Sequence, residues 1–149
     1  MCYYIFTLGD ISQHFNKKDF LCRCGQCDSE YYRIHLGLLG ALEAIGGNFR
    51  RTVNVLAGYL CEKEVVRRGS GVKSVHRQGR AAHIRVDGVK LQDVYKFVET
   101  LSELRGIGLD MEQGYVHVDT RREDRSLWVK EGGRHIPLTD DLRSRHGLA

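Results

Sequence analysis

Two short segments constrain the fold of this chain most, because each alternates apolar and polar residues and carries a histidine. The first is RAAHIRVDG, whose polar side includes His83, and the second is GYVHVDT, in which Val116 and Val118 alternate with His117. Successive side chains of a β-strand point to opposite faces of the sheet. We therefore expect two half-buried strands whose polar faces present His83 and His117.

Helical periodicity marks two other segments. Apolar residues recur every three or four positions over residues 34–45, before the pair Gly46 and Gly47, and over residues 91–104, before Gly106. This spacing gathers the apolar side chains on one face of a helix, and glycine is common where helices end. We expect two amphipathic helices that pack on a sheet.

Shorter elements complete the pattern. Residues 52–55 alternate as a strand does, and the run SLWV predicts another strand, which could pair with the strand of His117. Residues 61–75 are charged at first and then glycine-rich, which predicts a short helix and a loop. Asp10 can cap a short helix that ends at Phe15.

The order of these elements indicates the fold class. Helices and strands alternate irregularly, without the repeated strand and helix unit of a parallel sheet. We expect an α+β fold with an antiparallel or mixed sheet packed against helices and a metal site on the sheet. A chain of 149 residues fits a single domain, 1–149, and the polar segment 131–149 is expected to be a peripheral tail.

Charge and composition limit the partners. The 23 basic and 19 acidic residues are mixed along the chain, so the net charge of +4 permits an anionic partner without the focused patch expected for nucleic acid. The first ten residues lack the features of a secretory signal, and no apolar run approaches the roughly 20 residues that span a membrane. We expect a cytoplasmic protein with no nucleic-acid and no membrane partner.

The histidines predict a metal centre. His76 lies just ahead of the strand that carries His83, so adjacent strands would bring His76, His83 and His117 together. Catalytic zinc takes three protein ligands, and neutral imidazole is a preferred donor. A lone histidine is more often simply solvated or hydrogen-bonded, whereas these three together suggest a Zn²⁺ site.

Motifs around these histidines resemble a known family. One motif, SVHRQGRAAH at 74–83, is similar to the Ser-x-His-x-x-Gly-x-Ala-x-Asp signature of the zinc D-alanyl-D-alanine peptidases, with a change at its last position. A second, YVHVDTR at 115–121, resembles the later histidine motif of one branch, which often has an aromatic residue where Trp128 stands. Upstream, HFNKKDFLCRCGQC and AGYL resemble that branch's cysteine-rich start and its Ser-Gly-Tyr-Arg. The resemblance covers roughly residues 10–130.

The resemblance implies an activity. The family includes bacterial D,D-carboxypeptidases, phage endolysins and the related hedgehog domain, so it implies a hedgehog-like fold and a zinc peptidase of peptidoglycan stem peptides, either cytoplasmic or a phage-derived lysin. His76, His83 and His117 would hold zinc, and Asp119 would orient a ligand or handle protons. Two residues would line the substrate site: Tyr59 and Ser74.

Three departures from the family pattern bear on catalysis. His83 stands where the family has an aspartate ligand, Leu60 where it has an arginine that stabilises the intermediate, and Gly114 where many members have an acidic base. Candidate replacements are Arg67, Arg68 and Arg77 for the arginine, and Asp119 or Glu112 for the acid. The departures favour an alternative, a zinc-binding pseudoenzyme that binds a peptide or the cell wall without cutting.

The cysteines leave two interpretations open. Cys22, Cys24 and Cys27, with Cys61, could form a structural thiolate zinc site, or they could be reduced and packed thiols. An odd total of five in a chain without a secretory signal argues against a secreted disulfide scaffold. Four other histidines show no partner pattern and are set aside: His14, His35, His135 and His146.

Overall fold

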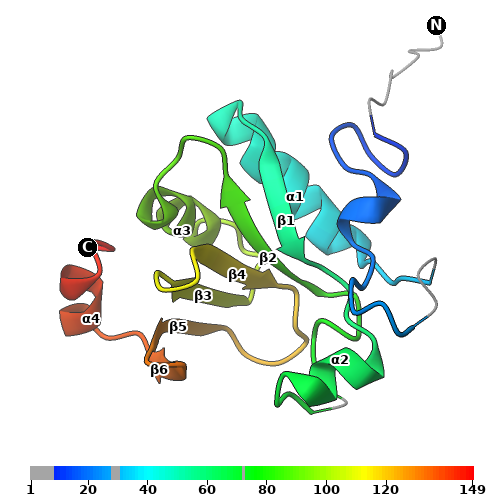
Figure 1. Cartoon of the computed structure of the whole chain (residues 1–149). Coiled ribbons are helices and arrows are strands. Elements are labelled where there is room, and N and C mark those ends of the chain that lie inside the picture. Colours follow the sequence, from blue (N-terminus) through cyan, green and yellow to red (C-terminus); the bar gives the residue numbers. More distant parts are fainter. Residues whose placement is uncertain (1–8, 28–30, 72) are drawn as a thin grey trace, which may run out of the picture.

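A six-stranded mixed sheet forms the centre of the computed structural model, which describes residues 9–27, 31–71 and 73–149 (Figure 1). The strands lie in the order β1-β2-β4-β3-β5-β6. Their bounds are Val53–Ala57 (β1), Ala81–Val86 (β2), Gly106–Asp110 (β3), Tyr115–Asp119 (β4), Ser126–Glu131 (β5) and Arg134–Pro137 (β6). Paired strands are antiparallel except β3 and β5, which are parallel. The expected α+β class with a mixed sheet is confirmed.

The two histidine-bearing strands lie side by side within this sheet. β2 and β4 pair in a register that sets His83 directly opposite His117. Their apolar residues, such as Ile84 and Val116, are fully buried in the core. The period-two pattern therefore predicted correctly which side of each strand faces the core.

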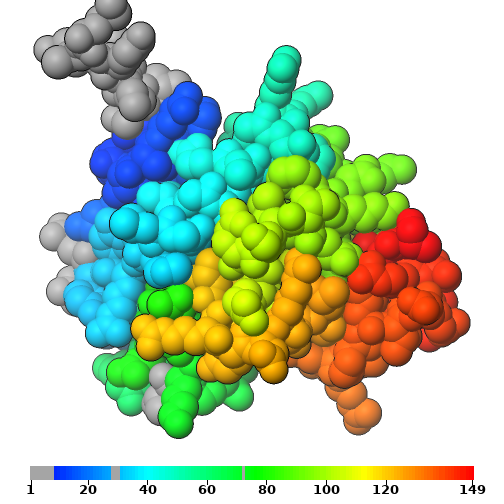
Figure 2. All heavy atoms as spheres, turned by 180° about the vertical axis from the view of Figure 1, so that it is seen from behind, coloured from blue at the N-terminus to red at the C-terminus, as the bar shows by residue number. Residues whose placement is uncertain are grey.

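Two helices cover that core face. They are α1 (Leu36–Phe49) and α3 (Leu91–Glu99), and their rings Phe49 and Phe97 meet edge to face with centroids 5.5 Å apart. Figure 2 views this side, where α1 (cyan) and α3 (yellow-green) lie over the sheet. α1 runs through the glycine pair where we expected its end, and stops at Arg50 with a left-handed φ of 52°. Shorter helices are η1 (Lys17–Asp19), α2 (Glu62–Arg67) and α4 (Asp140–Arg145).

One central strand was not predicted. The second amphipathic helix ends at Glu99 rather than near Gly106, and Gly106 instead begins β3. This strand separates the SLWV strand from β4, so β5 pairs in parallel with β3 and not with the strand of His117, as we had suggested. Two glycines in five residues hid the strand, because glycine has low β-propensity.

The two ends of the described chain also differ from expectation. Residues 9–14 form bends rather than a capped helix, and Asp10 Oδ1 accepts a hydrogen bond from the backbone of Lys17, 2.6 Å away. The segment after 131 is not peripheral, because it supplies β6 and α4 and buries Leu142 and Leu148 in the main core. Its few apolar residues were too widely spaced to reveal this. No helix among the described residues has the length and apolar character needed to cross a membrane.

Candidate metal centre

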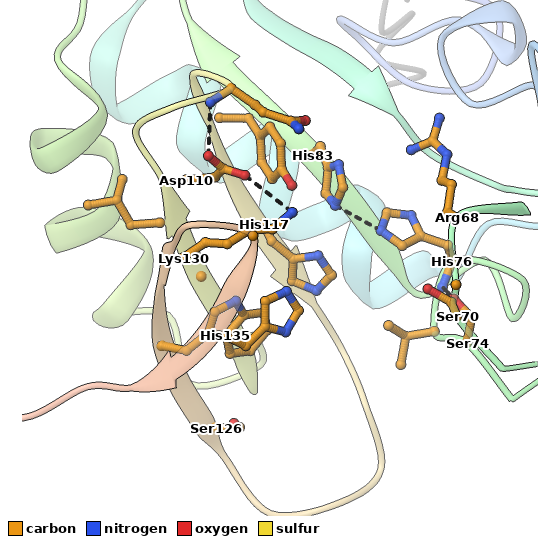
Figure 3. A pocket seen from close by; sticks show the side chains of 18 of the residues that line it. Arg68, Ser70, Ser74, His76, His83, Asp110, His117, Ser126, Lys130 and His135 are labelled. Carbon is orange, nitrogen blue, oxygen red and sulfur yellow. Dashed lines mark hydrogen bonds and ion pairs between the residues drawn. The ribbon is translucent and has the colours of Figure 1, made fainter.

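Three imidazoles meet on the face of the sheet that α1 and α3 leave uncovered. His83 and His117 project from β2 and β4, and His76 reaches them from the turns that precede β2 (Figure 3). One ring nitrogen of each lies within 4.8 Å of the other two. His76 Nε2 and His83 Nε2 are 3.1 Å apart. The fold thus brings together the three histidines that the sequence singled out.

Backbone contacts fix the position of His76. Its Nδ1 donates to the carbonyl oxygen of Gly58 at 2.9 Å, and its own carbonyl accepts from the backbone of Leu60 at 3.3 Å and of Gly79 at 3.2 Å. Gly79 has a φ of +71°, and a Cβ there would lie 2.5 Å from the backbone of Arg33. Because Nδ1 carries the proton, Nε2 presents its lone pair to the other imidazoles.

Aromatic side chains hold the other two rings. His83 stacks on Tyr115 with centroids 4.0 Å apart and an interplanar angle of 8°. His117 lies against Trp128 at a centroid distance of 5.0 Å. Trp128 needs Gly108 beneath it, since a Cβ at that position would lie 2.2 Å from the indole Nε1. The glycine that concealed β3 in the sequence therefore makes room for the wall of the site.

Asp119 orients His117 through a hydrogen bond to its ring. This fully buried carboxylate accepts from His117 Nε2 at 2.7 Å, and from Arg121 through Nε, Nη2 and the backbone N–H at 2.9, 2.7 and 3.1 Å. Gly106 leaves space for it, because a Cβ there would lie 2.1 Å from Oδ2. Burial alone would raise the pKa of Asp119, but the hydrogen bonds from Arg121 and His117 lower it. The neutral tautomer of His117 that keeps this bond has its lone pair on Nδ1.

The electrostatics favour the neutral form of His76 and of His83. Burial lowers the pKa of His76 to about 3, with a further contribution from His117, and burial followed by the two neighbouring imidazoles lowers the pKa of His83. Neutral imidazole is the form that binds metals. Tetrahedral zinc with Zn–N bonds of about 2.0–2.1 Å places its nitrogens about 3.3 Å apart. The 3.1 Å separation of His76 and His83 is close to that value, so the donor set fits zinc.

The three histidines line an open cavity of about 890 Å³. Four basic side chains share its wall: Arg67, Arg68, Arg121 and Lys130. Among the described lining residues Asp110 is the one carboxylate, and it pairs with Lys130 at 3.4 Å. All four cations are ion-paired, Arg67 and Arg68 with Glu64, Arg121 with Asp119 and Lys130 with Asp110, so the wall carries a small excess of positive charge.

Two cavity residues escaped the sequence analysis. Asp110 ends β3, and the alternation of Ile107 and Leu109 within GIGLD was the signal that could have revealed that strand. His135, which we set aside, lies on β6 and stacks on Trp128 with centroids 5.3 Å apart. No local signal identifies His135, because only the pairing of β6 with β5 carries it to the site.

The remaining candidate residues are divided between the cavity and its surroundings. Ser74 lines the cavity, and its Oγ accepts from the backbone N–H of His76 at 3.2 Å. Tyr59 is not among the described lining residues; it is buried and its ring meets Tyr31 edge-on, with centroids 5.6 Å apart. Leu60 lines the cavity at the place of the family's arginine.

Of the residues proposed to replace the family's arginine and acid, some line the cavity and others do not. Arg67 and Arg68 line the cavity, and both pair with the buried carboxylate of Glu64. Arg77 contacts Glu62 at 3.4 Å and is not among the described residues that line the cavity. Glu112 is exposed, accepts from the backbone of Gly132 and is not among the described residues that line the cavity.

Fold and site together define a class of protein. A zinc-compatible group of three imidazoles lies on a mixed sheet, at the wall of an open cavity, with one ligand held by a carboxylate. Such an open three-ligand centre is typical of metal-dependent hydrolases.

Comparison with protein families gives the same class. The family model described as Peptidase M15 matches residues 13–119, more than two thirds of the chain, and that range contains all three histidines and Asp119. The chain belongs to the peptidase M15 family, a family of metallopeptidases, and the resemblance found in the sequence is confirmed. No curated protein matches the chain.

Proposed function

We propose that this protein is a zinc-dependent peptidase that hydrolyses amide bonds of peptidoglycan stem peptides. The observation that carries the proposal is the convergence of His76, His83 and His117, with their ring nitrogens within 4.8 Å of one another, in the cavity of an M15-family chain. In this proposal the three histidines hold zinc. Bound zinc polarises a carbonyl oxygen and makes water a nucleophile at neutral pH.

The protein's own contribution begins with orientation of the ligands. Gly58 fixes the tautomer of His76, and Asp119 fixes that of His117. Such outer partners set the direction of a ligand's lone pair and raise its basicity. His83 in the place of the family aspartate makes the centre one charge unit more positive, which favours ionisation of water there.

Proton handling falls to Asp110 rather than to Asp119. Both oxygens of Asp119 already accept two hydrogen bonds each, and the residue is fully buried, so it is suited to hold His117. Asp110 is also buried, but it lines the cavity, where Oδ1 accepts one hydrogen bond from the backbone of Gln113 at 2.9 Å and Oδ2 pairs with Lys130 at 3.4 Å. It lies beside Tyr115, whose pKa is raised to about 12 by burial and by the Asp110 carboxylate. A general base has to reach the reacting group within about 3 Å, directly or through one water.

Positive charge suits the substrate class. A stem peptide ends in a carboxylate, and the four basic side chains of the cavity wall pair with three carboxylates, which leaves positive charge in excess. Arg68 lies beside His76 (Figure 3), and beyond burial and the imidazoles its charge helps to lower the pKa of both His76 and His83. Arg68 is therefore our candidate to stabilise a developing oxyanion in place of the arginine missing at Leu60, with Ser74 lining the same cavity.

A pseudoenzyme is the second candidate, favoured by apolar Leu60 on the cavity wall and by Gly114 in place of an acid. The test is hydrolysis of purified peptidoglycan and of a synthetic stem pentapeptide by zinc-loaded protein, with products identified by mass spectrometry. We expect release of D-alanine or a peptide fragment by the wild type and by His14→Ala, a surface control. His117→Ala should be inactive. Stoichiometric zinc with no cleavage of either substrate would establish the pseudoenzyme instead.

A further inference from the structure

A second group of potential ligands lies outside the histidine cavity. Cys22, Cys24, Cys27 and Cys61 place their sulfurs within 4.8 Å of one another, although Cys61 is distant in sequence from the other three. All four are free thiols. We call them the cysteine cluster. Four thiols that converge from two separate segments need an explanation beyond ordinary core packing.

The spacing of the sulfurs matches a tetrahedral thiolate site. Zinc–sulfur bonds of about 2.3 Å set the sulfurs of a tetrahedral site about 3.8 Å apart. Cys24 Sγ and Cys61 Sγ are 3.6 Å apart. A disulfide would require about 2.05 Å. The number of donors is also that of a structural site, which is closed by four protein ligands.

The local backbone supports sulfur as a metal ligand. Gly25 follows Cys24 with a φ of +74°, and this left-handed residue turns the chain so that the backbone N–H of Gln26 points at Cys24 Sγ, 3.4 Å away. An N–H directed at sulfur stabilises the thiolate form that metals bind. A side chain at Gly25 would meet no atom within 4 Å, so the backbone conformation rather than lack of space favours glycine there.

The surroundings bury Cys22 and Cys61, leave Cys24 and Cys27 half-buried, and compensate the charge of the cluster. Tyr59, Leu60 and Val65 pack with Cys22 and Cys61 as a small hydrophobic group apart from the main core. Cys24 borders a hollow that it shares with Arg23, Arg67 and Arg68 and with one carboxylate, Glu64, which pairs with Arg67 and Arg68, so cations are in excess there. Four thiolates around a divalent ion carry a net charge of −2, and neighbouring cations lower the cost of that charge.

We infer that the cysteine cluster is a second, structural zinc site, in which four thiolates join the loop of residues 22–27 to the start of α2. Soft thiolate donors select zinc, and structural zinc adds directly to folding free energy. The site also bears on the histidine centre. Cys61 lies three residues after Gly58, whose carbonyl holds His76, and Leu60 between them donates to the carbonyl of His76. This inference does not depend on the proposed peptidase activity.

Elemental analysis of protein expressed with zinc tests the inference. We expect two zinc ions per wild-type chain, one in Cys24→Ser, one in His83→Ala and none in the double variant. Cys2→Ser, a cysteine change outside the cluster, should retain two. A wild-type chain with one zinc that Cys24→Ser also retains would overturn the inference.

Cobalt exchange decides the question without a cysteine variant. In His83→Ala loaded with Co²⁺, all four thiols are present, so strong sulfur-to-cobalt charge-transfer absorption in the near ultraviolet is expected. Absence of that absorption would refute the site even if Cys24→Ser failed to fold. Peptide masses that reveal disulfides among the four cysteines of freshly purified protein, or iron in place of zinc, would also overturn it.

Discussion

The histidine centre and the cysteine cluster each bring potential metal ligands together, but from different kinds of structural element. Two of the three histidines are locked opposite each other by the pairing of β2 and β4, and their cavity is open. The four cysteines come from loops and from the residue that caps α2, and a hydrophobic group packs around them. Three ligands with an open position suit chemistry, and four ligands in a closed shell suit stability.

The two sites obtain their rigidity from different sources. Backbone hydrogen bonds of a central sheet preorganise the histidines before any metal binds. The loop of the cysteine cluster has few such bonds, so its geometry depends on the ion itself. Loss of either ion should lower stability, since both bind the folded chain, but only loss of the histidine-bound ion should abolish activity directly.

The largest expected effect is loss of activity at the histidine centre. His83→Ala should lower amide hydrolysis by more than about 100-fold, since even outer partners of zinc ligands cost about 10–100-fold. Its melting temperature should also fall, because zinc that binds only the folded chain adds to stability at this centre as well. Turnover on stem peptides and calorimetry on the same samples check this. Equal activity in His83→Ala and wild type would show that catalysis does not depend on the histidine centre.

Cys24→Ser should instead act on stability. Loss of an ion present at about 1,000 times its dissociation constant removes about 4 kcal/mol. For a chain of this size that lowers the melting temperature by about 8–16 °C. Thermal unfolding of His83→Ala, in which the cysteine cluster holds the remaining zinc, measures it with and without a chelator. The chelator should have little effect on the double variant of His83→Ala and Cys24→Ser. A wild-type melting temperature that does not change when the chelator is added would contradict the prediction.

Two carboxylates should separate orientation from proton transfer. Asp119→Asn should weaken zinc binding at the histidine centre about 10–100-fold, because His117 loses its charged partner, while the cysteine cluster keeps its zinc. Asp110→Asn should keep both ions and lower turnover by about 10²–10⁴. Competition with a chromogenic chelator and pH–rate profiles distinguish the two. The same zinc affinity and the same pH–rate profile in both variants would refute the assignment of orientation to Asp119 and proton transfer to Asp110.

Acid should destabilise the metal-free protein through the histidine centre. The folded pKa of His76 is about 3, well below the usual value of 6.5. Between these values the unfolded state holds a proton that the folded state lacks, so the free energy of unfolding falls as pH drops through this range. The slope is about 1.4 kcal/mol per pH unit for one such histidine. Chemical denaturation from pH 7 to 4 should give a shallower slope for His76→Gln and an unchanged one for Cys24→Ser.

The smallest expected effect comes from the wall of the histidine cavity. Gly108→Ala places a Cβ 2.2 Å from the Trp128 indole and should cost about 1–3 kcal/mol of stability by overpacking. Gly40→Ala, in α1 with no atom within 4 Å of the added Cβ, should stabilise by about 0.5–1 kcal/mol. Denaturant unfolding of both variants checks the sign. Trp128 fluorescence should change only in Gly108→Ala.

Local patterns in the sequence determined the main helices, strands β1, β2 and β4, and the faces on which the histidines lie. Alternation and helical spacing are properties of neighbouring residues, so His83 and His117 could be placed on polar strand faces without coordinates. The M15 resemblance also needed only short motifs. The departures at Leu60 and Gly114 were equally visible.

The contacts between residues that are distant in sequence followed only from the folded structure. It inserted β3 between β4 and β5, brought Asp110 and His135 to the cavity, and carried Cys61 to the cysteines of the loop. It also engaged Asp119 with Arg121 and His117 and left Arg68 at the cavity. Each of these results depends on strand order and on contacts between distant segments. Such contacts are fixed by burial and packing of the whole chain, which no local residue pattern encodes.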